Sequence, residues 1–267
     1  MHEKIKLTNA SLVITLRCTL KCKLCTAHVP YYAVPPHYSL ETISTAVKNF
    51  FAVIETVGKL TINGGEALMH PELPEILDEL SAYKGRIGLL ELLTNGTLLP
   101  KPRLLEKLRD NNVDILVNNY GGHLSVKVEK LVEAFKSYGI TYRLREQNED
   151  ERYFGGWVDI SDLTRKERDD ADTKALFGKC VYPGAFRCFA IFGDRAYICG
   201  VYKRCFDLGI VPDNPDEYVD FSDACADTLE GKILKIRRFY ERDFFSSCRF
   251  CDGFCPDSPR YLPAEQL

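Results

Sequence analysis

Three cysteines near the amino terminus are spaced in a way that suits an iron–sulfur cluster. Cys18, Cys22 and Cys25 are separated by three and two residues, and they follow a short apolar run at residues 11–16. A loop of this length can direct three thiolates at one cluster. Fe–S clusters are usually held by four cysteines, so a loop with three leaves one iron open to a small molecule. The spacing therefore predicts a reactive metal centre.

Two other interpretations of this loop stay open from the motif alone. His28 follows Cys25 at a gap of two residues, so the three cysteines and this histidine could bind zinc in a Cys₃His site. The spacing could also be coincidental, because the chain contains eleven cysteines. A decision depends on the rest of the chain.

The composition indicates the broad class of protein. The 267 residues suffice for one sizeable core and a small second unit. The net charge of −3 argues against a nucleic-acid binder that depends on a basic surface. No apolar run is long enough for a membrane span, and the first ten residues lack the apolar region of a signal peptide. We therefore expect a cytoplasmic protein that binds neither nucleic acid nor membrane, in which so many cysteines indicate metal rather than disulfides.

Residues 179–267 contain a second group of cysteines, eight of the eleven. Cys188 and Cys199 flank two apolar strands around a Gly-Asp pair, a pattern that predicts a β-hairpin. A helix near residues 228–243 should follow. The further candidate ligands in this segment are Cys180, Cys248, Cys251 and Cys255. A hairpin with a Cys-x₂-Cys pair fits a zinc ribbon as well as an Fe–S cluster.

The elements that must position these cysteines alternate between strand-like and helix-like segments from residue 11 to about 145. Strands are expected at residues 11–16, 59–62, 86–93, 113–117 and 140–145. Helices are expected after Ser39, after Pro71, near residues 102–110 and after Ser125. This alternation predicts an α/β fold with a parallel sheet, either doubly wound or curled into a full or partial barrel.

Polar and glycine-rich residues follow the predicted strands, where parallel α/β folds place their active sites. The cysteine loop follows the first strand. The next three loops contain, in order, Gly64-Gly65-Glu66, Thr94-Asn95 and Asn118-Asn119. Each of these loops alone could be an ordinary turn. In a barrel all four share one rim, so we expect them to form one site.

The cysteine spacing and the second loop together resemble the radical S-adenosylmethionine (SAM) superfamily. The three cysteines after the first strand correspond to its C-x₃-C-x₂-C signature, and Gly64-Gly65-Glu66 corresponds to its GGE motif. The resemblance covers roughly residues 8–145 and implies a partial (β/α)₆ TIM-like barrel. It also implies a 4Fe–4S cluster whose fourth iron binds the amino and carboxylate groups of SAM, and an electron donor such as flavodoxin or ferredoxin.

The resemblance also implies cofactor contacts for individual residues. The residues concerned are Leu24, Gly64, Gly65, Glu66, Thr94, Asn95 and Asn118. The backbone of Gly65 and the side chain of Glu66 would bind the amino end of SAM, and Asn118 would contact its ribose or carboxylate. Leu24 stands where the family usually has an aromatic residue, so here an aliphatic side chain would pack against the adenine.

Downstream of such a barrel, residues 179–267 resemble the twitch domain, a shortened relative of the SPASM domain that binds an auxiliary 4Fe–4S cluster. The layout is that of the 2-deoxy-scyllo-inosamine dehydrogenase group. The ligands implied by this layout are Cys180, Cys199, Cys248 and Cys251. Cys188 or Cys255 could replace one of them. Cys205 and Cys225 are expected to be ordinary thiols.

The segment between these two units, residues 146–178, breaks the alternation. Trp157 either packs in the core or lines the substrate cavity. The charged run at residues 162–174 is expected to be a solvated linker. We therefore expect a barrel domain at residues 1–178, with its linker from about residue 146, and a cluster domain at residues 179–267.

These parts imply that a 5′-deoxyadenosyl radical abstracts hydrogen from a small hydroxylated substrate, such as a sugar or aminocyclitol, with net oxidation. The cluster loop begins at residue 18, which leaves no room for the leader-binding domain of many peptide-modifying enzymes. Arg143 and Arg145 share a strand face and could bind a substrate phosphate or carboxylate, or form an exterior ion pair. The alternatives are an epimerase with Cys188 or Cys255 as hydrogen donor, a peptide-modifying maturase, and a non-catalytic Fe–S or zinc protein.

Overall fold

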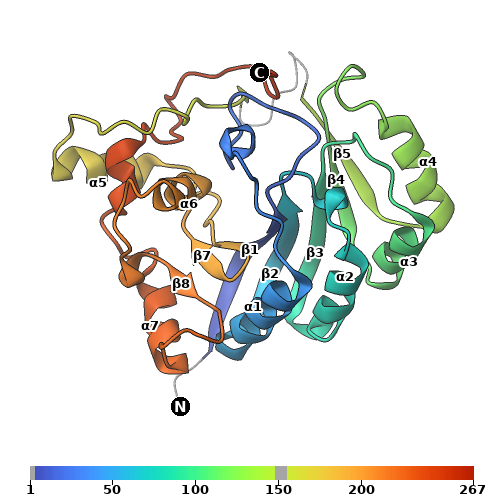
Figure 1. Cartoon of the computed structure of the whole chain (residues 1–267), viewed down its shortest axis with the longest axis horizontal. Coiled ribbons are helices and arrows are strands. Elements are labelled where there is room, and N and C mark those ends of the chain that lie inside the picture. The colour runs from blue at the N-terminus through green and yellow to red at the C-terminus, as the bar shows by residue number, and fades with distance from the viewer. Residues whose placement is uncertain (1–3, 148–154) are drawn as a thin grey trace.

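The computed structural model describes residues 4–147 and 155–267, which form one eight-stranded sheet (Figure 1). The strand order is β5-β4-β3-β2-β1-β6-β7-β8. The strands are β1 (Ile5–Thr15), β2 (Ile54–Gly64), β3 (Ile87–Thr94), β4 (Asp114–Asn119), β5 (Tyr142–Glu146), β6 (Ala190–Phe192), β7 (Arg195–Tyr197) and β8 (Val219–Asp220). The sheet is open and its first five strands are parallel, which confirms the predicted α/β fold with a partial barrel.

Helices α1 to α4 connect consecutive strands and cover one face of the sheet (Figure 1). The helices of the described ranges are α1 (Leu40–Val53), α2 (Leu73–Ser81), α3 (Pro102–Asp110), α4 (Val128–Tyr138), α5 (Asp170–Lys179), α6 (Gly200–Asp207) and α7 (Leu229–Arg238). The predicted start of α1 is confirmed, because the Ser39 hydroxyl accepts a hydrogen bond from Thr42 N at 3.2 Å. Ile43, Val47 and Phe50, which recur at helical spacing, are buried.

The strands present an apolar face to these helices and a more polar face to the inside of the barrel. On β2, Leu60 and Ile62 are buried in the core, whereas Thr61 lines the interior cavity. On β3, Leu92 is buried in the core and Glu91 faces the cavity. The strand predicted at residues 86–93 therefore packs against helices with one face, and its other face lines the interior cavity.

The sixth parallel strand joins the sheet on the side of β1 away from β2. β6 pairs with β1, with Ser11 opposite Ala190 and Val13 opposite Phe192. β6 is also the first strand of the predicted hairpin with β7, which is confirmed as antiparallel. The hairpin therefore joins the parallel sheet through its first strand.

The last helix is shorter than expected. The predicted helix near residues 228–243 ends at Arg238, and beyond it Phe239 and Phe245 pack in the core with ring centroids 5.2 Å apart. One hydrophobic core runs through both parts of the chain, and the boundary at residue 178 stays a prediction.

Two features of the sequence remain to be placed. Most of the polar stretch after β5, residues 148–154, lies outside the described residues. None of the helices in the two described ranges is both long and apolar enough to cross a lipid bilayer.

Candidate functional site

The loop after β1 brings Cys18, Cys22 and Cys25 close enough for the three thiols to influence one another. Leu20 N donates a hydrogen bond to Cys18 Sγ at 3.4 Å. Burial raises the pKa of the Cys18 thiol to about 12 and that of the Cys22 thiol to about 11. Neighbouring buried thiolates need a compensating cation, because burial and like charge both disfavour them. The three thiols and their N–H donor therefore fit an iron–sulfur cluster.

A single zinc ion fits this loop less well. His28 Nε2 lies 3.2 Å from Ile160 O, so only the buried Nδ1 of this ring would be left as a ligand atom. Within residues 4–147 and 155–267, no three Cys, His, Asp or Glu side chains converge closely enough to hold one metal ion. An iron–sulfur cube binds its thiolates on separate irons and so accepts a wider spacing than one ion does.

The two glycines after β2 allow the second loop to lie directly on the cysteine loop. A Cβ atom on Gly65 would lie 2.3 Å from Arg17 O and 2.9 Å from the Cβ of Cys18. On Gly64 it would lie 2.3 Å from Thr15 O. Gly65 N donates a hydrogen bond to Thr15 O at 2.9 Å, which closes the contact. Glycine is required here because any side chain would separate the two loops.

Glu66 joins the second loop to the third. Its side chain is only 1% exposed, and it accepts hydrogen bonds from Asn95 N at 2.7 Å and from Leu68 N at 3.0 Å. Burial raises the pKa of Glu66 to about 7, although these backbone N–H groups and the side chain of Thr94 lower it. The carboxylate thus sits at the rim with its charge only partly compensated. Its contact with SAM stays a prediction.

The asparagines of the third and fourth loops reach the same rim. Asn95 Nδ2 lies 3.5 Å from Cys18 Sγ and 3.1 Å from Thr19 Oγ1. Asn118 Oδ1 is buried without a hydrogen-bond partner in the part of the chain that the structure describes, which leaves an acceptor for a bound group. Leu24 is buried within the cysteine loop. Their predicted cofactor contacts are untested.

A cavity of about 570 Å³ lies inside the barrel and reaches the cysteine loop at Thr26 and Ala27. Its polar lining comes mainly from the strands and includes Asn9, Ser11, Lys59, Thr61, Asn63, Glu91 and Arg145. Its aromatic lining includes Trp157, Tyr182, Phe186, Phe189, Phe192 and Phe254. Trp157 both lines this cavity and packs beside Leu20 and Cys22, and its contact with a substrate stays a prediction. The cavity offers one hydrogen-bonding surface and one apolar surface.

Glu91 is a buried carboxylate in this lining that sequence reasoning missed. It is 2% exposed and accepts hydrogen bonds from Thr61 Oγ1 at 3.1 Å and from an Arg143 nitrogen at 2.5 Å. Lys59 Nζ lies 3.5 Å from it. A single acidic residue within an otherwise apolar predicted strand is the signal that could have identified Glu91, because such a residue is rarely buried without partners.

The two arginines of β5 differ in their surroundings. Arg143 pairs with Glu91 and, at 3.1 Å, with Asp114, so its guanidinium is engaged by carboxylates of the chain. Arg145 lines the cavity. The binding of an anionic group of a substrate by either arginine stays a prediction.

Four cysteines of residues 179–267 line one small apolar pocket. They are Cys180, Cys199, Cys248 and Cys251. Cys180 follows the end of α5, Cys199 caps the start of α6, and the other two belong to or follow a short 3₁₀ helix, Ser246–Phe250. Tyr202 N donates to Cys199 Sγ at 3.4 Å. Burial raises the pKa of Cys248 and of Cys251 to about 12. This set of four thiols fits a 4Fe–4S cluster.

The remaining cysteines of this segment do not line that pocket. Cys188 lines the barrel cavity instead. Cys255 is buried beside α5, with its Sγ 3.9 Å from Leu176 O. Cys205 is fully buried in the core, and Cys225 Sγ accepts a hydrogen bond from Asp227 N at 3.4 Å.

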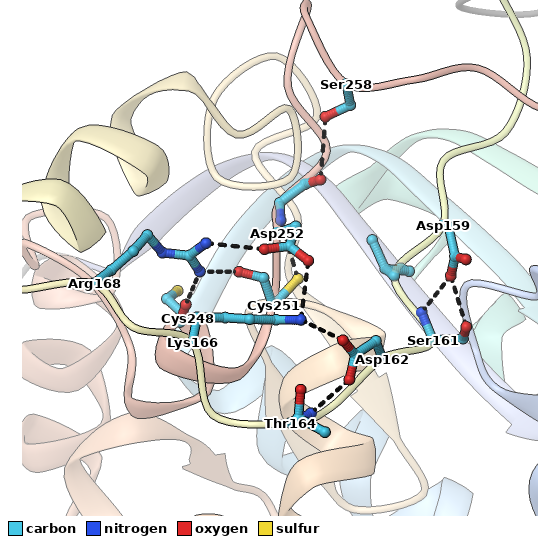
Figure 2. A network of polar contacts seen from close by, with 12 residues as sticks. Asp159, Ser161, Asp162, Thr164, Lys166, Arg168, Cys248, Cys251, Asp252 and Ser258 are labelled. Atoms are coloured by element: carbon cyan, nitrogen blue, oxygen red, sulfur yellow. Dashed lines mark hydrogen bonds and ion pairs between the residues drawn. The ribbon is translucent and has the colours of Figure 1, made fainter.

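The charged run at residues 162–174 is mostly exposed, as expected of a solvated linker, but two of its cations bind the second cysteine loop. Figure 2 shows Arg168 donating hydrogen bonds to the backbone carbonyl oxygens of Cys248, at 3.1 Å, and of Cys251. Arg168 also pairs with Asp252 at 2.9 Å, and Lys166 pairs with the same carboxylate at 3.0 Å. Lys166 and Arg168 depart from that expectation, because they pair with carbonyl groups and an acidic side chain of the cysteine loop. Alternating charge in the sequence does not reveal such partners.

The comparisons with known proteins agree with this geometry. Residues 12–142 match the model of the radical SAM superfamily. The chain is 41% identical to GTP 3′,8-cyclase 1 of Mycobacterium tuberculosis over 88 residues, an alignment that covers 31% of this chain and 24% of that protein. It is 30% identical to GTP 3′,8-cyclase of Lactiplantibacillus plantarum over 118 residues, which cover 43% of this chain and 32% of that protein. The alignments thus span about a quarter to a third of these relatives.

Solved structures share the fold over almost the whole chain. The structure of anSMEcpe with bound AdoMet matches with a TM-score of 0.58 and 16% identity, over 98% of this chain and 93% of that one. BtrN in complex with AdoMet and 2-DOIA matches with a TM-score of 0.50 and 13% identity, over 99% and 98%. At such identities the likeness shows a common fold. Residues 12–142 of this chain are a radical SAM domain.

Proposed function

We propose that this chain is a radical SAM enzyme that abstracts a hydrogen atom from a small hydroxylated substrate, such as a sugar or aminocyclitol, with net oxidation. The observation that carries the proposal is the place of the cavity. It borders the cysteine loop at Thr26 and Ala27, and Tyr182 and Phe254 line both this cavity and the four-cysteine pocket. A substrate held there would lie between the two candidate cluster sites.

The lining of the cavity supports this class of substrate. Hydroxyl and amino groups of a ring can bond to Asn9, Ser11 and Thr61, whose side chains alternate with core residues along the strands. The less polar face of the same ring can pack on aromatic side chains such as Trp157 and Phe186. Few polar groups placed in a largely apolar cavity are what orients a small ligand.

The residues present fit two clusters. Cys18, Cys22 and Cys25 would hold the SAM-binding 4Fe–4S cluster, and the four cysteines of the apolar pocket would hold an auxiliary 4Fe–4S cluster. When bound, the first would supply the electron that cleaves SAM into methionine and the 5′-deoxyadenosyl radical, and the second would supply an acceptor for the electron left on the substrate once that radical has taken a hydrogen atom. The chain itself positions SAM through Glu66 and Asn118 and excludes water with the aromatic lining. A flavodoxin or ferredoxin would donate the first electron.

Epimerisation is the second candidate, and the position of Cys188 favours it. This thiol lines the cavity, whereas Cys255 does not. A thiol in that place can return a hydrogen atom to a substrate radical from the side opposite to its abstraction. The relatives are named as GTP cyclases, but the match to GTP 3′,8-cyclase 1 covers only 31% of this chain and 24% of that protein, so their substrate is not part of our proposal.

Anaerobic reconstitution with iron, sulfide, SAM and dithionite tests the proposal. We expect 5′-deoxyadenosine to form, and to form faster when a sugar or aminocyclitol that fits the cavity is added. Failure to form it under any of these conditions would leave only a non-catalytic Fe–S or zinc protein.

Deuterated water and two matched variants separate oxidation from epimerisation. Oxidation yields a ketone or aldehyde without deuterium at the reacting carbon, and Cys188→Ser retains turnover. Epimerisation yields an inverted product with one solvent deuterium, because the S–H group exchanges with water, and Cys188→Ser abolishes that product. Cys255→Ser is the control, because this buried thiol lies outside the cavity lining.

A further inference from the structure

Residues 261–267, which we call the strap, lie across the first cysteine loop (Figure 1). Lys23 N donates a hydrogen bond to Glu265 O at 2.7 Å, and Leu267 N donates one to Lys21 O at 3.0 Å. These bonds pair the strap with the loop in antiparallel fashion, with Cys22 opposite Gln266. More than two hundred residues separate the partners in the sequence, so the contact is one of tertiary structure.

The strap is fixed in place at both ends of its path. Tyr261 exchanges two backbone hydrogen bonds with Trp157, at 2.8 and 2.9 Å. Ala264 is 1% exposed and packs with Leu20 and Cys22. Its φ of 59° is unusual for a residue with a side chain, so the surrounding contacts must hold it there. The strap is therefore an ordered part of the cysteine loop's surroundings.

The side chain of Gln266 is directed at a cluster ligand. Its Nε2 lies 3.3 Å from Cys22 Sγ, while its Oε1 accepts a hydrogen bond from Lys21 N at 2.8 Å. Nε2 also donates to Ala264 O at 2.6 Å. With the oxygen held by the backbone of Lys21 and one hydrogen held by Ala264, the second amide hydrogen faces the sulfur.

We propose that Gln266 is a positioning residue for the SAM-binding cluster. Its side-chain amide donates a hydrogen bond to the Cys22 sulfur and so favours the reduced form of the cluster. A reduced cluster carries one more negative charge, part of it on its cysteine sulfurs, so donors to sulfur make reduction easier. Cys18 receives donors from Leu20 N and Asn95, within the barrel rim, whereas the side-chain donor to Cys22 comes from the strap. This inference rests on the proposed function.

The test compares three variants of the full chain, reconstituted anaerobically, in a redox titration followed by EPR. The signal that changes when SAM is added reports the SAM-binding cluster. In Gln266→Leu we expect a more negative midpoint, equivalent to a loss of about fivefold in the reduction equilibrium for one hydrogen bond of ordinary strength. In Gln266→Glu we expect a still more negative midpoint, because the carboxylate keeps the bond from Lys21 N but turns an acceptor toward the sulfur.

Glu265→Gln is the matched control. Glu265 neighbours Gln266, but its exposed side chain pairs with Lys23 at 3.6 Å and contacts no cysteine, so its variant should retain the wild-type midpoint. Wild-type midpoints in both Gln266 variants would overturn the inference. If the leucine variant binds no iron, the glutamate variant decides, since an unchanged midpoint there refutes the role of the amide. A wild-type signal that SAM never alters would instead refute the proposed function.

Discussion

At the scale of single residues, Glu66 connects the chemistry of the rim to pH. Burial raises its pKa to about 7, so the carboxylate is largely neutral below that pH and charged above it. A charged acceptor binds an ammonium group about twice as strongly as a neutral one. The proposed contact with the amino end of SAM therefore requires the deprotonated form.

We expect the affinity of the reconstituted wild-type chain for SAM to fall as the pH decreases through 7, by up to about tenfold per pH unit. Glu66→Gln should retain both clusters, bind SAM more weakly at pH 8 and lose this pH dependence. Equilibrium dialysis between pH 6 and 8 measures both. Equal affinity of the two proteins at pH 8 would mean that Gly64-Gly65-Glu66 is only a turn.

Arg168 permits a second prediction at this scale. Its guanidinium bonds to the carbonyl groups of Cys248 and Cys251, so its removal should release the loop that carries two of the four proposed auxiliary ligands. We expect Arg168→Ala to reduce bound iron from about eight to about four per chain, with the SAM-sensitive EPR signal unchanged. Arg165→Ala is the control, because Arg165 is exposed and its guanidinium lies 6.0 Å from the ring of Phe250. Full iron content in Arg168→Ala would show that the loop with Cys248 and Cys251 keeps its conformation without these hydrogen bonds.

At the scale of elements, the loop after β1 and the end of β2 lie so close together that there is no room for a side chain at Gly65. Gly65→Ala would place a methyl group 2.3 Å from Arg17 O, so the loops must separate and the three cysteines must move. We expect this variant to lose about half of the bound iron after reconstitution. Gly85→Ala is its control, since a Cβ there meets no atom within 4 Å. Iron analysis measures the bound iron, and thermal unfolding shows whether the variant is folded. A folded Gly65→Ala variant with full iron would contradict the packing argument.

Elements whose partners are close in sequence could be predicted, and those with distant partners could not. β1 to β5 and their helices follow from local apolar periodicity, and so does the hairpin of β6 and β7. The pairing of β6 with β1 joins residues about 180 apart and leaves no local signal. The same holds for Arg168 on the cysteine loop and for Gln266 beside Cys22, because polar residues reveal their partners only in three dimensions.

The candidate site divides in the same way. Cys18, Cys22, Cys25 and the Gly-Gly-Glu turn were recognisable because chemistry fixes their spacing within a short loop. The layout of the second segment implied Cys180, Cys199, Cys248 and Cys251 and left Cys188 or Cys255 as a replacement; the structure brings those four to one pocket and places Cys188 at the cavity. Glu91 stands out as the one acidic residue of β3, but its partners Thr61 and Arg143 lie on other strands and could not be read from the sequence.

At the scale of the whole molecule, the two proposed cluster sites should be separable by iron content. The full chain is expected to bind about eight irons, four at each site. Replacing Cys18, Cys22 and Cys25 together with alanine should leave about half of that iron and remove the EPR signal that SAM changes. A triple variant with undiminished iron would refute the assignment of the first site.

The contact between the strap and the cysteine loop also has a consequence for the order of biosynthesis. The ribosome makes residues 18–25 well before residues 261–267, so iron can reach the first loop before the strap covers it. A chain cut after residue 260 should therefore load its first cluster at an undiminished rate but surrender that iron to a chelator sooner than the full chain. Equal release from both would mean that the strap offers no such retention. Slower release from the full chain would mean that the strap, made long after the cysteine loop, retains the iron that this loop has already bound.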